Sequence, residues 1–211
     1  MNGPLLDTLA VEFMESGWDI KHMVRLIVSS RAYQRSSNAP AEMFERDPEN
    51  RFVARQSRYR LPAELVRDNA LAIGGLLSPE IGGPSVKPYQ PDGYWENLNF
   101  PPRTYSADPA PLQHRRGLYV WWQRSFVHPS MLAFDAPTRE ECAADRSQSN
   151  IPQQALVLLN DPTYLEAARG LATNILCEGD AELAGRVARA FRRATARQPS
   201  PKELDLLLQL H

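Results

Sequence analysis

The sequence predicts a mainly α-helical domain of antiparallel helix pairs, interrupted by one long irregular loop rich in aromatic residues, with room for one short strand. Three observations lead to this fold class. Apolar residues recur at helical spacing near both ends, helix-capping residues precede those stretches, and a middle segment rich in proline and glycine breaks the pattern. We expect a single domain over residues 1–211, helical at 1–77 and 129–211 and irregular at 78–128.

The first two helices are expected on either side of Gly17. Residues 4–16 carry a helical apolar stripe made of Leu5, Leu6, Leu9, Ala10, Phe13 and Met14. Gly17 suits the left-handed position that ends a helix, and Asp19 can cap the next one. That helix repeats the spacing at Met23, Val24, Ile27 and Val28. Because the link is short, the two helices should pack as an antiparallel hairpin.

The middle of the chain contains one further helix before regularity disappears. Residues 36–50 are polar and indicate a connection, whereas "LPAELVRDNALAIGGLL" (61–77) predicts a helix with Pro62 in its first turn. Residues 78–116 are rich in proline and glycine, yet their aromatic residues argue against a disordered linker. "GLYVWWQRSF" (117–126) is short and aromatic, which favours a strand with Trp121 and Trp122 facing opposite sides.

The last third of the chain contains successive helix start signals. Asn150 and Gln153 form a capping-box pattern, and Asp161 followed by Pro162 indicates a new helix that Gly179 closes. Asp180 can cap the next helix, and Ser200–Pro201 begins the final one. These signals predict four consecutive helices.

Composition excludes several classes of function. The 24 basic and 25 acidic residues give a net charge of −1 without a basic stripe, which argues against a nucleic-acid partner. The longest apolar run, "ALVLL" at 155–159, is too short to span a membrane, and the N-terminus lacks the pattern of a signal peptide. Cys142 and Cys177 form no CxxC or CxxCH motif, which excludes a zinc finger and covalent haem attachment but leaves a disulfide open.

The stretch "FDAPTREEC" (134–142) permits two interpretations. In the structural one, Asp135 begins a turn and Thr138 with Glu141 forms a capping box at a helix start. In the functional one, Asp135 forms an acid–base pair with Glu140 or Glu141 next to His128, and Arg139 orients an anion. Capping patterns are common, so the structural interpretation is favoured. Four residues of the functional interpretation remain the candidate catalytic residues: Asp135, Glu140, His128 and Arg139.

The aromatic loop suggests a second type of site. Aromatic rings can stack on sugars, so the candidate ligand-binding residues are Tyr94, Trp95, Trp122 and His114. The alternative is that the rings hold the loop against the helices as a small core. No metal site is expected, because none of the histidines has a second His or a Glu four positions away, the i,i+4 spacing of metal ligands. Cys142 would need a histidine partner to be a nucleophile, and a buried inert thiol is the more frequent outcome.

Three segments resemble one family in the same order: "PLLDTLAVEFMESGWDIKHMVRLIVSSRAYQRSS", "IGGPSVKPYQPDGYWENLNF" and the stretch from "QHRRGLYVWW" to "YLEAARGLA". The chain is similar to the planctomycete-type domain of unknown function 1553, a C-terminal module of large exported proteins that often carry a cytochrome c domain upstream. This resemblance implies an exported or periplasmic setting, partners among the upstream domains, and haem on a separate domain only. It provides no catalytic residues to transfer. It also implies that Met1 and His211 fall inside the family's domain, so that the chain is a fragment of it, and that Ile151 replaces an expected threonine.

Three functions are compatible with these observations. The preferred one is a non-catalytic interaction or scaffold module of an exported, cytochrome-c-linked protein, since every charged motif has an adequate structural role. The second is a carbohydrate-binding or carbohydrate-active site built from the aromatic loop with Asp135, His128 and Arg139. The third is a truncated fragment without independent function.

Overall fold

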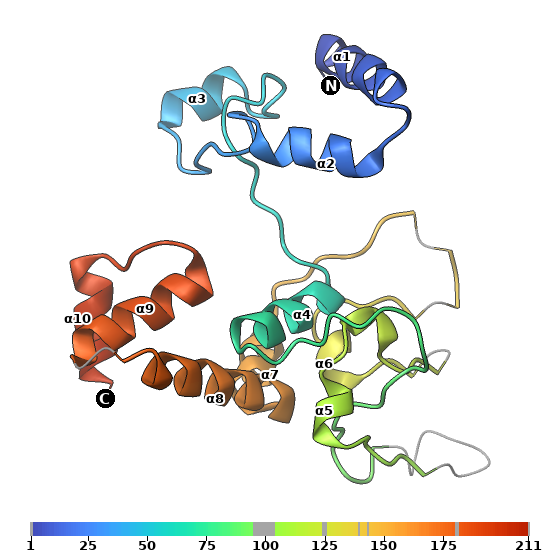
Figure 1. The fold of residues 1–211 in the computed structure, drawn as a ribbon, viewed down its shortest axis with the longest axis vertical. Helices are drawn as coiled ribbons and strands as arrows, with labels where there is room; N and C mark the ends of the chain where they lie inside the picture. Colours follow the sequence, from blue (N-terminus) through green and yellow to red (C-terminus); the bar gives the residue numbers. More distant parts are fainter. Residues whose placement is uncertain are drawn as a thin grey trace. The chain divides into compact units, whose positions relative to one another are not determined.

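The computed structural model describes residues 2–94, 104–123, 126–138, 140–142, 144–179 and 182–210. The chain divides into two compact units, Met1–Arg60 and Leu61–His211 (Figure 1). These described residues form ten α-helices and one short 3₁₀ helix, and their β pairing is limited to isolated bridges. The expected mainly helical fold is therefore confirmed.

The first unit contains helices α1 (Gly3–Glu15), α2 (Ile20–Ser29) and α3 (Ala41–Arg46). Gly17 has a φ of 73° after α1, and the Asp19 carboxylate accepts hydrogen bonds from the backbone N–H groups of Lys21 and His22 at 2.8 and 3.1 Å. These local signals act as predicted. The side chains of Phe13 and Trp18 meet edge to face across the link, with ring centroids 5.2 Å apart.

Helix α3 lies in the segment that was expected to be only a connection. It is six residues long, and a buried aspartate and a buried arginine hold the turns after it in place. The Asp47 carboxylate accepts from the N–H groups of Arg51 and Phe52 at 2.8 and 2.9 Å. The Arg55 guanidinium lies 4.3 Å above the Phe44 ring and donates to the Pro48 carbonyl at 2.9 Å. Tertiary contacts of this kind stabilise a helix that is too short to be predicted from periodicity.

The second unit is built on a long helix. Its elements are α4 (Ala63–Ile73), α5 (Ala110–Gln113), the 3₁₀ helix η1 (Gly117–Tyr119), α6 (Pro129–Leu132), α7 (Pro152–Asn160), α8 (Pro162–Cys177), α9 (Leu183–Thr195) and α10 (Pro201–Gln209). Helix α8 packs against α4, α7 and α9, and α10 packs against α9 (Figure 1). The main core cluster lies where α4 meets the segments around α6, and consists of Ala63, Val120, Val127, Met131 and Ala136 with Trp122 and Phe134 packed against it.

Helices α4 and α8 approach each other so closely that their backbones touch. A Cβ atom built on Gly170 would lie 2.5 Å from the carbonyl oxygen of Gly74, and one built on Gly74 would lie 2.5 Å from the carbonyl oxygen of Ala167. The Asn174 amide donates to the Gly74 carbonyl at 3.0 Å. The absence of a side chain at Gly74 and Gly170 therefore sets the distance between the two helices.

The segment expected to be a strand has a different structure. Gly117–Tyr119 turns as a 3₁₀ helix, and Val120 then pairs with Val86 in one isolated parallel bridge, in which the Trp121 N–H donates to the Val86 carbonyl at 2.7 Å. A second bridge joins Gln123 and Phe126. The pairing stays limited to single bridges, because the partner segment around Val86 is interrupted by prolines that cannot donate to a ladder.

The C-terminal helices follow the sequence signals at most of their ends. Asp161 caps α8 by accepting from the Thr163 N–H at 2.9 Å, and Ser200 forms a complete capping box with Glu203 at the start of α10. Gly179 ends α8 with a φ of 83°. The predicted capping box of Asn150 is wrong: the N-cap of α7 is Ile151, which has no polar side chain to cap with. The predicted cap at Asp180 lies outside the described residues.

Candidate functional site

A buried arginine connects α4 to the aromatic loop. Arg67 is only 2% exposed, and its guanidinium donates to the carbonyl oxygens of Arg115, at 2.7 Å, and Gln113. Burial lowers the pKa of Arg67, while the neighbouring Asp68 carboxylate acts in the opposite direction. Asp68 in turn accepts from the Gly117 N–H at 2.5 Å. Two charged residues of one helix turn therefore position the chain from α5 to η1.

Arg115 and Gln113 extend this network to the first half of the loop. The Arg115 guanidinium, stacked 4.0 Å from the Tyr119 ring, donates to the carbonyl oxygens of Pro84 and Gly82. The buried Gln113 amide accepts from the Tyr89 N–H at 3.0 Å and donates to the Asp108 carbonyl. Side chains here replace the hydrogen bonds that a sheet would supply, which is how an irregular segment stays ordered.

His128 stands at the start of α6 and contacts the loop at Tyr89. It is 3% exposed; its Nε2 lies 2.7 Å from the Tyr89 carbonyl oxygen, and its Nδ1 lies 2.8 Å from the Ser130 hydroxyl and 3.3 Å from the Ser130 N–H. A carbonyl oxygen can only accept, so Nε2 carries the proton and Nδ1 accepts from Ser130. The imidazole is therefore neutral and acts as the N-cap of α6.

Burial lowers the pKa of His128, against a smaller opposite effect of its bond to the Tyr89 carbonyl and of the Asp161 carboxylate. In the unfolded chain the same group titrates near pH 6.5. As the pH falls through about 6.5, the unfolded state takes up a proton that the folded state does not, so stability is lost toward acid.

We expect His128→Asn to reduce this pH dependence. Asparagine is a good N-cap and can accept from the Ser130 N–H, but it does not titrate. The urea midpoint of the wild type should therefore fall more steeply between pH 7 and pH 5 than that of the variant. Parallel curves for the two proteins would show that His128 does not contribute to the acid sensitivity.

A groove of about 510 Å³ borders this histidine. Tyr89, Gln90 and Pro91 of the loop form one wall, and the rest is formed by Pro129, Ser130, Gln153, Leu156, Val157, Asn160, Asp161 and Pro162 of α6, α7 and the start of α8. The surface is mostly apolar, with amide groups at Gln153 and Asn160. Sequence reasoning missed Ser130 and Tyr89; the "HPS" pattern, with a polar residue before a proline and a helix start, is the signal that marks Ser130.

The Ser130 hydroxyl and the His128 ring are adjacent, but their geometry favours a structural role. In a hydrolytic site a carboxylate usually binds the second ring nitrogen and stabilises the charged imidazolium. Here that nitrogen is bound by the Tyr89 main-chain carbonyl, and burial disfavours the charged ring. The pair is therefore better suited to fixing α6 against the loop than to accepting a proton from a nucleophile.

Asp135 closes the loop that comes after α6. It has a φ of 61° and ends the helix in a Schellman arrangement, in which the Ala136 N–H donates to the Met131 carbonyl at 3.1 Å. Its two carboxylate oxygens accept from the N–H and the hydroxyl of Ser149, both at 2.7 Å. Asp135 thus ends the turn that follows α6 instead of beginning a turn that leads into a new helix, and it also joins the two ends of the acidic segment.

The prediction of a helix that begins after Thr138 is wrong. Residues 140–142 are non-helical and exposed, so the predicted capping box of Thr138 and Glu141 does not form. The Thr138 carbonyl instead lies 3.4 Å from the Trp122 indole nitrogen. The physical reason is that "EECAADRSQS" has no apolar stripe to bury, and a short helix is not stable in water without one.

The remaining candidate residues lie in different places. The His114 ring is 3.3 Å from the Glu166 carboxylate on α8, and Trp122 packs against the core cluster. Glu140 is exposed and Tyr94 is half-buried, whereas Arg139 and Trp95 lie outside the described residues. Among the described residues, His, Cys, Asp and Glu side chains do not gather in groups of three or more that could hold a metal ion.

Comparison with known proteins places the chain in a family. All of residues 1–211 match the family model described as "PSD1: Protein of unknown function (DUF1553)". The chain belongs to the DUF1553 family. No curated protein and no solved structure matches it. In the described part of this DUF1553 chain, no helix is both long enough and apolar enough to cross a bilayer.

Proposed function

We propose that this DUF1553 chain is a non-catalytic interaction module that docks through one face of α2 onto another domain of an exported, cytochrome-c-linked protein. The surface of the partner domain that binds this face of α2 is apolar and bordered by carboxylates. The observation that carries the proposal is the exposure of apolar side chains in the first unit.

Helix α2 has a complete apolar stripe that is left open to solvent. The stripe occupies positions i, i+4, i+7 and i+8 of the helix. Its side chains are exposed to solvent by 69% at Ile20, 55% at Val24, 41% at Ile27 and 42% at Val28. A stripe with this spacing is the part of an amphipathic helix that normally packs against a neighbour. None of the described side chains of α1, α2 and α3 is buried. A unit of this kind gains stability when another surface covers it.

The charges beside the stripe indicate what the partner presents. Lys21 and Arg25 lie together along one edge of the apolar stripe, and α2 itself contains no acidic residue. A docking surface with carboxylates around an apolar centre would match this arrangement in both shape and charge. The upstream domains of the family proteins are the proposed source, with the haem of the assembly on the cytochrome domain and the whole protein in the periplasm or another exported location.

The second unit supports the non-catalytic part of the proposal. His128 is neutral, buried and bound to main chain, and Asp135 uses both carboxylate oxygens on Ser149. Both of these residues, which were candidates for a catalytic role, therefore have structural roles.

Calorimetric titration with the separately produced upstream domains of a full-length relative tests the proposal. We expect saturable binding to the wild-type chain and binding about 10- to 100-fold weaker for Val24→Lys, because the partner loses one buried valine contact and must bury a charge. Val24 is exposed, so the variant should fold normally.

The matched control is Ser29→Lys, which adds the same charge to α2 on the side opposite Val24. It should bind as tightly as the wild type. Undetectable binding of the wild type, or equal affinities of all three proteins, would refute the docking role of this face.

A further inference from the structure

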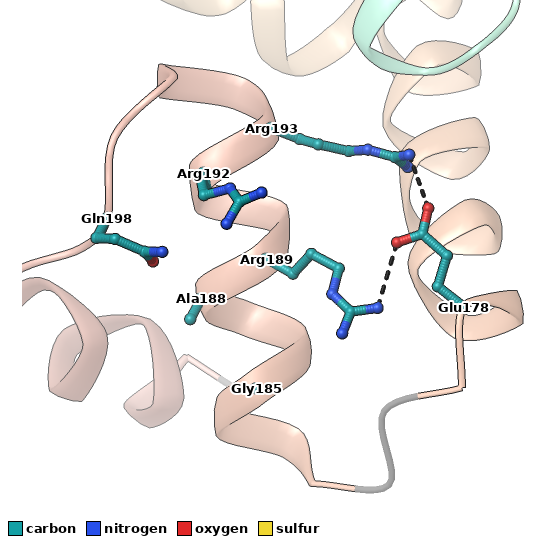
Figure 2. Close-up of a pocket in the computed structure, with 7 residues that line it drawn as sticks. All are labelled: Glu178, Gly185, Ala188, Arg189, Arg192, Arg193 and Gln198. Atoms are coloured by element: carbon teal, nitrogen blue, oxygen red, sulfur yellow. Dashed lines mark hydrogen bonds and ion pairs between the residues drawn. The ribbon is translucent and has the colours of Figure 1, made fainter.

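A second surface of the molecule contains a concentration of positive charge. Helix α9 has four arginines and no acidic residue, and three of these arginines line a cavity of about 500 Å³ between α9 and the end of α8. The lining residues are Glu178, Gly185, Ala188, Arg189, Arg192, Arg193 and Gln198 (Figure 2). Three guanidinium groups therefore share the cavity with one carboxylate.

The Glu178 carboxylate uses two of the three arginines. Its Oε1 lies 2.7 Å from Arg193 Nη2, and its Oε2 lies 3.3 Å from Arg189 Nη1 (Figure 2). All three side chains are between 33% and 42% exposed, so this bridge is open to solvent and contributes little to folding. It places the two guanidinium groups at the wall of the cavity.

Arg192 is the third arginine of the cavity, and it does not form an ion pair with Glu178. Within the residues that the structure describes, its guanidinium has no hydrogen bond, ion pair or ring contact. It lies one turn along α9 from Ala188 and lines the cavity together with it (Figure 2). The first arginine after the end of α9, Arg197, is bound by the Glu203 carboxylate at 2.6 and 2.9 Å and does not line the cavity. Arg192 thus adds a positive charge that is not paired with any carboxylate among the residues that the structure describes.

We infer that the cavity between α8 and α9 binds a dianionic phosphate group, held by Arg192 together with Arg189 and Arg193. Guanidinium groups bind phosphate oxygens with two parallel N–H donors, so three of them around one anion suit a phosphate dianion better than a singly charged carboxylate. The volume also leaves room for an organic group on the phosphate. Glu178 opposes binding, because it repels the anion and occupies donors that the phosphate would use.

Calorimetric titration of the full chain with inorganic phosphate, supported by ³¹P NMR line broadening, tests this inference at constant ionic strength. We expect saturable binding to the wild type and about 10-fold weaker binding to Arg192→Gln, from the loss of one charge-assisted contact. Glu178→Gln should bind phosphate several-fold more tightly than the wild type. This increase distinguishes a true site from general attraction to a basic surface.

Three further comparisons complete the experiment. Arg169→Gln, which removes an exposed cation elsewhere on α8, should bind phosphate like the wild type. Acetate should bind about 10-fold more weakly than phosphate. Phenyl phosphate should bind more tightly than inorganic phosphate if the organic group enters the cavity, and equally or less tightly if the site accepts free phosphate.

Equal phosphate binding by the wild type and Arg192→Gln, or a weakening by Glu178→Gln, would overturn the inference. None of these substitutions touches α2, so the docking proposal succeeds or fails independently.

Discussion

Arg67→Met is expected to destabilise the second unit by about 3–5 kcal/mol, because two charge-assisted hydrogen bonds are lost and their acceptors stay buried. Methionine fills a similar volume, so the effect reports hydrogen bonding rather than a cavity. The carbonyl oxygens of Arg115 and Gln113 would lose their donor, and the loop would lose its attachment to α4. Urea unfolding measures the free energy, and limited proteolysis should show earlier cleavage within residues 78–94 and 104–116.

Two further variants test whether the loss of hydrogen bonds is what destabilises Arg67→Met. Arg67→Lys keeps the charge but has one nitrogen for two acceptors, so its loss of stability should be intermediate. Arg169→Met, on the exposed side of α8, should stay within about 0.5 kcal/mol of the wild type. A change of less than about 1 kcal/mol in Arg67→Met would mean that the loop is held by other contacts.

Gly170→Ala should destabilise the protein by about 1–3 kcal/mol, although alanine is the better helix former. The new methyl group would lie 2.5 Å from the Gly74 carbonyl oxygen, which belongs to backbone and cannot rotate away. Helices α4 and α8 would have to separate, and the hydrogen bond from Asn174 to Gly74 would lengthen. Urea unfolding again gives the free energy.

Thr173→Ala is the matched control for the helix-propensity part of that prediction. It lies one turn further along α8 and is exposed, so the gain in propensity acts alone and should stabilise the protein by a few tenths of a kcal/mol. Opposite signs for the two alanine substitutions are expected. Stabilisation by both would show that the helices have room to adjust at Gly170.

Local chemistry explains which elements could be predicted from the sequence. Asp19, Asp161 and Ser200 cap helices as expected, because a cap depends on residues two or three positions away. The failures also have a physical cause. Thr138 has the local pattern of a cap but precedes a segment with nothing to bury, and α3 has no pattern but is stabilised by Arg55.

The candidate site was less predictable because its contacts join distant parts of the chain. Arg67 bonds residues 46 and 48 positions away, and His128 bonds Tyr89, which is 39 positions away. One signal was present in the sequence: Arg67 occupies the same helical face as Ala63 and Leu71, the other two buried residues of α4. An arginine within an apolar stripe indicates a buried cation, although it does not indicate what the cation binds.

The way in which Arg67 and Arg115 hold the aromatic loop affects how the family can diverge. Both guanidinium groups donate to main-chain oxygens, which every amino acid possesses, so the course of the loop depends on two arginines, one in α4 and one between α5 and η1. Substitutions can therefore accumulate, without refolding the loop, at the loop positions that contribute only a main-chain oxygen to these bonds. The exposed side chains of such a loop can therefore differ between members of the family while the course of its backbone stays the same.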